Sequence, residues 1–160
     1  ATGLHKASLY NAFGGKEELY LRSLDRYHDS IETRLQQLFD AHSGAEGIAA
    51  WMGTLLEMCH GNAGKRGCFA ANAVAERANH DPKVRRIVHQ HEQRLRRILQ
   101  TAIEAAQADG SLTVDTEARD LTDLLWTFGK GLRFAARGGE SIRSLEAQRM
   151  AMRRLVLGAG

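Results

Sequence analysis

The stretch DPKVRRIVHQHEQRLRRILQTAIEAAQADG, residues 81–110, predicts a long amphipathic helix. Asp81 is a residue type that caps helix N-termini, and a proline such as Pro82 is favoured at the first helical position. Apolar residues then recur every three or four positions, which places them on one helical face. They are Val84, Ile87, Val88, Leu95, Ile98, Leu99, Ala102, Ile103 and Ala106, with His91 in the middle of the stripe. Asp109-Gly110-Ser111 is expected to end the helix.

Six further stretches show helical patterns. Their expected ranges are 6–13, 16–43, 45–60, 68–78, 116–136 and 141–157. Asp115 is expected to cap the helix at 116–136. Gly129 and Gly131 interrupt that helix at a cost of about 1 kcal/mol each against alanine, which indicates close helix packing. No strand alternation or internal repeat is visible in the sequence, so we predict an all-α fold of seven helices.

The composition is that of an ordinary soluble protein. The chain has 160 residues, of which 43% are hydrophobic and 26% charged, and this length suffices for one globular domain with its own core. No apolar run approaches the roughly 20 residues that span a bilayer, and no signal peptide opens the chain. We therefore expect a cytoplasmic protein with no membrane partner. The net charge is +3, and residues 1–16 carry His5, Lys6 and Lys16 without any acid.

A second stretch, TGLHKASLYNAFGGKEEL at residues 2–19, carries the most specific signal. It begins with a small-Gly-apolar turn and continues with a short helix that bears Leu9-Tyr10 and then Phe13. The pattern Gly-x-Lys-Glu-x-Leu, which starts at Gly14, follows directly. In this order and spacing, the segment resembles the end of a TetR-family DNA-binding domain.

Later segments resemble the sensor domains of one branch of the same family. The residues that carry this likeness are Arg66-Gly67-Cys68-Phe69, Asn72, Glu76, His80-Asp81-Pro82, Gly131-Leu132-Arg133 and Ala136-Arg137-Gly138. The resemblance implies a TetR-like helical bundle with a truncated N-terminal helix-turn-helix. Residues 1–40 would be the end of the DNA-binding domain and a connecting helix, and residues 41–160 the ligand-binding and dimerisation domain.

The resemblance places a DNA-binding site on the first helix. A recognition helix lies in the major groove with its early residues at base edges, while other side chains and helix N-termini hold phosphates. The expected DNA-contacting residues are His5, Lys6, Ala7, Tyr10, Asn11 and Lys16, of which Tyr10 and Lys16 would contact phosphates. Without the motif, these would be ordinary surface residues. The family places two helices before this segment, so we expect DNA binding from the intact protein rather than from residues 1–160 alone.

The middle helices carry bulky apolar residues that suit an effector pocket. Pocket walls made of methionine and aromatic side chains fit flat or hydrophobic molecules, and a few polar groups would orient such a ligand. The pocket candidates are Met52, Leu55, Cys59, Phe69, Asn72, His91 and Trp126. The alternative is that most of them are plain core, with His91 a core histidine whose nitrogens find polar partners.

The last two helices are the candidates for self-association. Two helices from each subunit would form a four-helix interface with two-fold symmetry, as paired DNA-reading heads require. The predicted interface residues are Leu121, Phe128, Gly129, Leu132, Leu145, Met152 and Leu155. The alternative is a seven-helix monomer.

Two cysteines, Cys59 and Cys68, do not make a disulfide framework. Cys68 is a redox candidate because Arg66 and the amides at the start of its helix would favour the thiolate. The alternative is a pair of buried, inert thiols.

The sequence thus predicts a ligand-responsive transcriptional regulator, a repressor that a small-molecule effector releases from double-stranded operator DNA. The effector would change the separation of two heads in a homodimer. An enzyme is not supported, because the sequence contains no His-Glu-x-x-His, no phosphate-binding glycine loop and no nucleophile with an evident base. A helical ligand-binding or interaction module without DNA binding is the alternative. No metal or cofactor is indicated.

Overall fold

The computed structural model describes residues 6–61, 64 and 67–158. Over these ranges the chain forms seven α-helices and no strand, which confirms the predicted all-α fold. The elements are α1 (Lys6–Phe13), α2 (Lys16–Ala41), α3 (Gly44–Glu57), α5 (Phe69–Ala73), the π-helical turn η1 (Val74–Ala78), α6 (Pro82–Ala108), α7 (Ala118–Arg137) and α8 (Ile142–Leu157). Within the described ranges, no helix is long and apolar enough to cross a membrane.

Two details differ from the sequence-based expectation. The helix expected at 68–78 is split into α5 and the wider turn η1. Asp115 does not cap α7, because the N-cap position is Glu117, whose side chain makes no capping hydrogen bond. A side chain of the preceding helix contacts the connection before α7 instead. Gln107 on α6 donates a hydrogen bond to the backbone oxygen of Thr116 at 2.8 Å.

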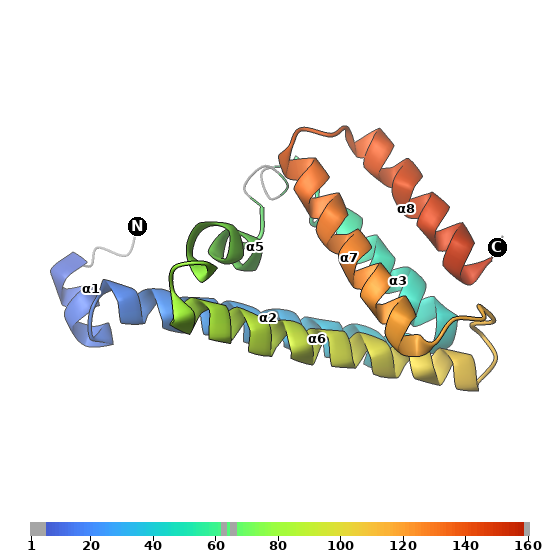
Figure 1. Cartoon of the computed structure of the whole chain (residues 1–160), viewed down its shortest axis with the longest axis horizontal. Coiled ribbons are helices and arrows are strands. Elements are labelled where there is room, and N and C mark those ends of the chain that lie inside the picture. Colours follow the sequence, from blue (N-terminus) through green and yellow to red (C-terminus); the bar gives the residue numbers. More distant parts are fainter. Residues whose placement is uncertain (1–5, 62–63, 65–66, 159–160) are drawn as a thin grey trace.

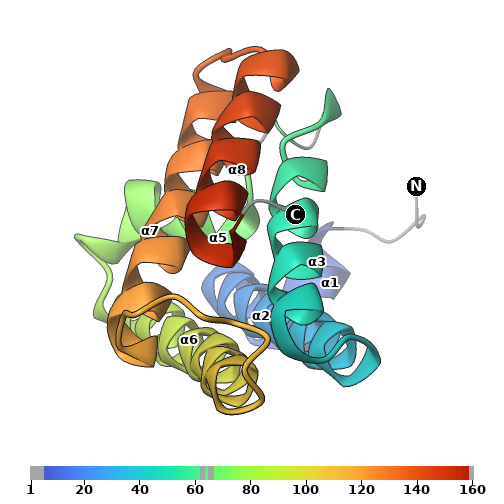
Figure 2. The ribbon, with the colours of Figure 1, turned by 90° about the vertical axis from the view of Figure 1, so that its right-hand side faces the viewer.

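The long helices α2 and α6 lie side by side and run in the same direction (Figure 1). Contacts between them follow both sequences in order: Lys83 pairs with Glu17, and eight residues later His91 meets Asp25. Helices α3, α7 and α8 stand across the far end of this pair, and α8 packs on both α3 and α7 (Figures 1 and 2). Among the described elements, α1 contacts only α2, at the opposite end (Figure 1).

The apolar stripe of α6 serves two cores. Its first residues, Val84 and Val88, join a small cluster with Leu21 and Leu24 of α2. Its later residues join the main core, which also receives side chains from α2, α3, α7 and α8; these later residues are Leu95, Leu99, Ile103 and Ala106. The predicted stripe is therefore confirmed as the buried face of α6, and His91 lies between its two halves.

Only one of the two glycines of α7 provides a close helix approach. A Cβ atom on Gly129 would lie 3.1 Å from both terminal carbons of Leu55, so the missing side chain lets α7 pack against α3. A Cβ atom on Gly131 would meet nothing within 4 Å. Close packing therefore explains Gly129 but not Gly131 within a single copy of the chain.

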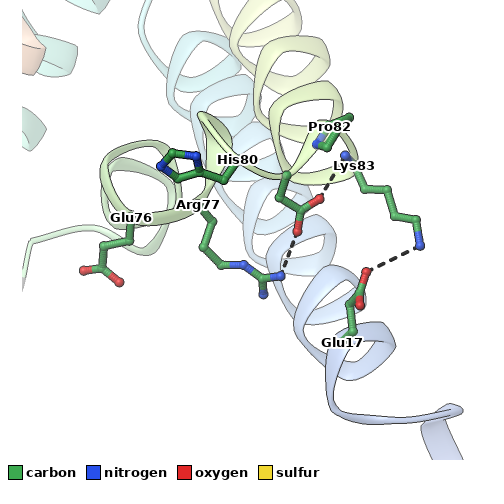
Figure 3. Close-up of a pocket in the computed structure, with 7 residues that line it drawn as sticks. Glu17, Glu76, Arg77, His80, Pro82 and Lys83 are labelled. Atoms are coloured by element: carbon green, nitrogen blue, oxygen red, sulfur yellow. Dashed lines mark hydrogen bonds and ion pairs between the residues drawn. The ribbon is translucent and has the colours of Figure 1, made fainter.

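The start of α6 is fixed by Asp81. Its Oδ1 atom accepts hydrogen bonds from the backbone amides of Lys83 and Val84 at 3.0 and 3.3 Å. Its Oδ2 atom accepts one from Arg77 at 2.7 Å, and Lys83 reaches Glu17 on α2 (Figure 3). This arrangement confirms Asp81 as the N-cap and Pro82 as the first helical residue.

We expect Asp81→Ala to lower the free energy of unfolding by about 1–2 kcal/mol, because two amides and one guanidinium lose their acceptor. Asp81→Asn is the matched control: it keeps an acceptor for the amides and should cost less. Urea denaturation followed by circular dichroism measures both. Equal stability of Asp81→Ala and the wild type would show that the cap contributes nothing.

Candidate functional site

A cavity of about 400 Å³ lies between α2, α3, α6 and α7. Its walls are mostly aromatic and aliphatic, and the polar lining side chains include two arginines, one threonine and one acid. The lining residues are Tyr27, Ile31, Arg34, Leu35, Leu38, Trp51, Thr54, Leu55, Glu57, Met58, Leu95, Trp126, Gly129 and Arg133. Its volume and chemistry are those of a site for a small organic molecule.

One wall of the cavity is locked by hydrogen bonds. The indole of Trp126 donates to Glu92 Oε1 at 2.7 Å, and Lys130 donates to the same oxygen at 2.9 Å. Burial raises the pKa of Glu92, but the hydrogen bonds and charge of Lys130 and the bond from Trp126 outweigh it and hold the pKa below its usual value. The carboxylate therefore stays ionised and keeps the Trp126 ring in place.

Two guanidinium groups and one phenol supply the polar side of the cavity. Arg34 donates to the backbone oxygen and the hydroxyl of Ser30, one turn earlier on α2. Arg133 donates through Nε to the backbone oxygen of Gly129 at 3.1 Å. Burial raises the pKa of Tyr27, which keeps the phenol neutral at physiological pH.

A smaller hollow of about 100 Å³ adjoins this cavity. It shares Tyr27, Met58 and Arg133 with the larger one and adds Cys68. Cys68 is partly exposed, and its sulfur accepts a hydrogen bond from the backbone amide of Ala71 at the start of α5. Arg66, the other part of the redox argument, lies outside the described residues.

The cavity contains two of the seven predicted pocket residues, Leu55 and Trp126. Met52 and Cys59 are buried in the main core and do not line it. Phe69 stands behind the wall, where its ring meets that of Tyr27 edge-on at 5.7 Å. Sequence reasoning missed the α2 side of the cavity, because the residues of that helix look like an ordinary amphipathic stripe.

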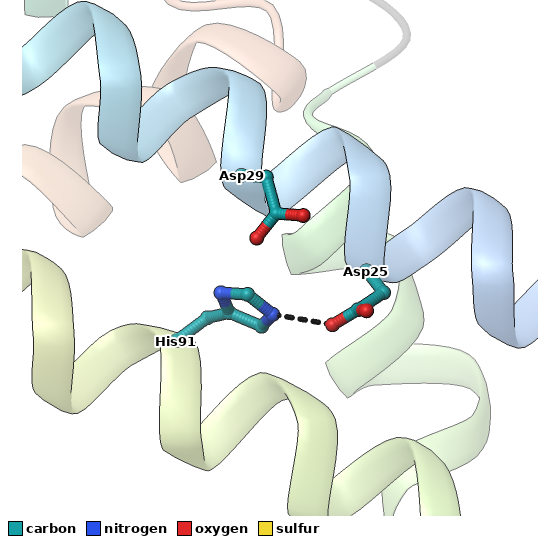
Figure 4. Close-up of side chains that lie close together, drawn as sticks. All are labelled: Asp25, Asp29 and His91. Atoms are coloured by element: carbon teal, nitrogen blue, oxygen red, sulfur yellow. Dashed lines mark hydrogen bonds and ion pairs between the residues drawn. The ribbon is translucent and has the colours of Figure 1, made fainter.

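Two predicted polar pocket residues lie elsewhere. Asn72 accepts a hydrogen bond from Arg137 at 2.6 Å, away from the cavity lining. His91 is 1% exposed and faces α2, where its Nε2 atom lies 2.7 Å from Asp25 Oδ1 (Figure 4). The core-histidine alternative therefore describes His91, and the prediction that it lines the cavity with Leu55 and Trp126 is corrected.

His91 belongs to a polar cluster in the contact between α2 and α6. Asp25, Asp29 and His91 each offer a ligand atom within 4.8 Å of the others, a spacing that could hold a cation (Figure 4). Both ring nitrogens of His91 already have protein partners, however, because Arg94 lies 2.9 Å from Nδ1 while Asp25 meets Nε2. We therefore interpret the cluster as a hydrogen-bond network that joins the two helices.

His28 completes this cluster from α2. Its ring stacks on that of His91 with centroids 4.4 Å apart, and it is 2% exposed. Its buried Nδ1 atom has no hydrogen-bond partner among the described residues. Burial and the neighbouring His91 lower the pKa of His28 from 6.5 to about 4, although Asp25 and Asp29 oppose the shift. The ring is therefore neutral in the folded chain at pH 7.

The predicted DNA-facing residues lie on or next to α1. Gly14 and Gly15 have φ of 79° and 119°, which only glycine adopts readily, and they turn the chain from α1 into α2. Tyr10 is half-buried, and Asn11 and Lys16 are exposed. His5 lies outside the described residues, as do the side chains of Lys6 and Ala7.

The predicted dimer residues are mostly internal. Leu121, Leu132 and Leu145 are 0–2% exposed and Gly129 is buried, so these four face the core of the same chain and are corrected. Phe128 and Met152 are half-buried against that core.

The open apolar surface of the last two helices includes one of the predicted interface residues, Leu155, and two that were not predicted. Three large apolar side chains are exposed here: Leu155 on α8 (76%), and Phe134 (81%) and Leu124 (51%) on α7. Phe134 and Leu124 were not among the predicted interface residues. Gly131 is exposed on the same helix.

The pKa of His28 has a consequence for stability. Between pH 6.5 and 4 the unfolded chain binds a proton at this residue and the folded chain does not. Stability should therefore fall as the pH drops through this window, by about 2–3 kcal/mol from this group. Urea denaturation at several pH values should show a smaller loss for His28→Phe and the full loss for His89→Phe, an exposed control on α6. Identical pH dependence in all three proteins would contradict the assignment.

The two cysteines should differ in reactivity. Cys59 is 4% exposed, its thiol donates to the backbone oxygen of Leu55, and burial raises its pKa. We expect iodoacetamide to label Cys68 at least about tenfold faster than Cys59 in the folded chain, as measured by peptide mass spectrometry. If Cys68 reacts no faster in the folded than in the denatured chain, the redox hypothesis fails.

Comparison with known proteins agrees with this architecture. Residues 44–152 match the family model described as the tetracyclin repressor-like C-terminal domain. The reduced form of NemR from E. coli superposes with a TM-score of 0.83 at 20% identity, over 98% of this chain and 82% of that one. A TetR-family transcriptional regulator from Agrobacterium tumefaciens superposes with a TM-score of 0.85 at 20% identity, over 97% and 82%.

At this identity, the two structures establish the fold alone. No curated protein sequence gives a significant match. The family model covers most of the chain, and the family consists of transcriptional regulators that are not enzymes. The chain therefore belongs to the tetracyclin repressor-like (TetR) family of transcriptional regulators.

Proposed function

We propose that this chain is the ligand-sensing body, with the end of the DNA-reading head, of a cytoplasmic repressor that a small-molecule effector releases from operator DNA. One observation supports the proposal: α2, the helix that follows α1 and contacts it, also forms a wall of the cavity. Tyr27, Ile31 and Arg34 line the cavity from α2, and α1 lies at the N-terminal end of the same helix. A ligand in the cavity therefore touches the element that positions the head.

The release step needs differential binding. A ligand shifts the equilibrium between two head arrangements only if it binds one of them more tightly. Residues on α2 and α7 face the cavity together, so a ligand that prefers one spacing of these helices would favour one position of α1. Heads at the wrong separation no longer fit two operator half-sites.

In this proposal α1 is the recognition helix. His5, Lys6 and Ala7 would meet base edges, and Asn11 would follow along the groove. Tyr10 and Lys16 would hold phosphates, and the exposure of Lys16 at the start of α2 supports this role. The division of the chain into a DNA-binding part at 1–40 and a sensor part at 41–160 belongs to the same proposal.

The two heads come together through a homodimer that uses the outer faces of α7 and α8. Phe134 and Leu155 are large apolar side chains left open on these helices, and Gly131 leaves room for a close approach. The exposure of these large apolar side chains supports an interface on the two helices. The two helices from each copy would pack as a four-helix bundle around a two-fold axis.

DNA binding is tested with the protein produced from its complete gene. An operator is first selected from a random duplex pool, and its affinity is then measured by fluorescence anisotropy across salt concentrations. Lys16→Gln should weaken binding and reduce the salt slope by about one per bound head, because one phosphate contact is lost. Arg97→Gln, an exposed site on α6, is the charge-matched control and should behave as the wild type. Failure to select any duplex, or equal effects of the two variants, would refute the proposal.

The dimer is tested by light scattering. We expect a mass of twice the 17.7 kDa chain for the wild type and a monomer for Phe134→Glu combined with Leu155→Glu. Both side chains are more than three-quarters exposed, so their replacement leaves the core of each copy intact. Val74→Glu, an exposed apolar site outside α7 and α8, serves as the control and should remain a dimer. A wild-type monomer at high concentration would exclude this interface.

A further inference from the structure

We infer that the cavity between α2, α3, α6 and α7 takes an apolar anion, a molecule with an aliphatic or aromatic body and one carboxylate-like group. This inference rests on the proposed role of the cavity as the effector site, and it adds the chemical class of the ligand. Two properties of the lining support it, the apolar walls and the state of the two arginines, and so does the pairing of cations in two other grooves.

The apolar walls of the cavity fit the aliphatic or aromatic body of the proposed ligand. Both tryptophans of the chain, Trp51 and Trp126, line the cavity together with Tyr27 and five aliphatic side chains; the latter are Ile31, Leu35, Leu38, Leu55 and Leu95. Glu92 and Lys130 hold the Trp126 ring from behind, so this wall is formed before any ligand arrives. Apolar walls with little polar surface favour a ligand with a hydrophobic body over a sugar or a nucleotide.

Arg34 and Arg133 fit the negative charge of the proposed ligand. No carboxylate among the described residues lies within ion-pair distance of Arg34 or Arg133. The described part of the chain uses only the Nε atom of Arg133, which leaves its two terminal nitrogens able to donate elsewhere. A guanidinium with two parallel donors matches a carboxylate. The neutral phenol of Tyr27 adds a further donor at the same wall.

Two other grooves among the described residues do not combine these features. In the groove at the start of α6, Arg77 pairs with Asp81 at 2.7 Å and Lys83 with Glu17 at 3.4 Å (Figure 3). In a groove between α2 and α6, Arg94 lies 3.4 Å from Glu32. The cavity instead combines two arginines outside any such pair with a single acid, Glu57, which is exposed.

The two arginines also connect the ligand to the head. Arg34 belongs to α2, which bears α1, and Arg133 belongs to α7, one of the two helices of the proposed dimer interface. An anion that contacts both walls would change the preferred spacing of these helices. The charged group of the ligand would thereby contribute to release as well as to affinity.

The test compares three ligands that share one chain length: octanoate, 1-octanol and octylammonium. Binding is measured at pH 7 by the fluorescence of the two cavity tryptophans and independently by titration calorimetry. We expect octanoate to bind at least tenfold more tightly than octanol and octylammonium to bind most weakly. Arg133→Gln and Arg34→Gln should each reduce the preference for octanoate over octanol, and Arg97→Gln should leave it unchanged. Thermal unfolding of each variant without ligand verifies that it is folded.

The outcomes separate this inference from the proposed function. Tighter binding of octanol or octylammonium would keep the cavity as an effector site but overturn the anion assignment. Binding of octanoate that none of the cavity arginines affects would also overturn it. If none of the three ligands binds, the inference fails, and operator binding by the same protein still decides whether the chain is a DNA-binding regulator.

Discussion

Two long helices, α2 and α6, run side by side in the same direction, and this contact fixes where every functional element lies. Apolar residues hold it at both ends, and a polar cluster around His28 and His91 holds it in the middle. The cluster costs desolvation but leaves little freedom of register, because a shifted helix would separate His91 from Asp25 and Arg94 from Glu32.

This contact gives α2 two tasks at its two ends. Near its start it contacts α1, and from Tyr27 onward it lines the cavity together with α3, α6 and α7. A rigid helix transmits a small shift at one end to the other, so the cavity needs no separate connection to the head. The smaller hollow beside Cys68 shares Tyr27 and Arg133 with the cavity. A reaction at the Cys68 thiol would therefore alter the surroundings of these two lining residues.

Much of the fold was predictable because helix signals are local. The stripe of α6 and the cap at Asp81 depend on residues within a few positions of one another, and the structure confirms both. The predictions that failed depended on distant partners. Asp115 is a good capping residue, but the connection to α7 is set by Gln107 from another helix. The division of 68–78 into α5 and η1 likewise had no signal in the local pattern.

The sequence by itself determined the helices, the family resemblance and the kind of residue that faces inward. Only the tertiary structure decided which inward residue meets a cavity and which meets a neighbour. His91 and Leu35 lie on similar buried stripes, yet His91 is satisfied by Asp25 while Leu35 borders open space. Leu132 is likewise internal, and Phe134, two positions later, is open. The physical reason is that periodicity fixes a side chain's direction on its own helix, whereas the angle and distance between helices fix what it touches.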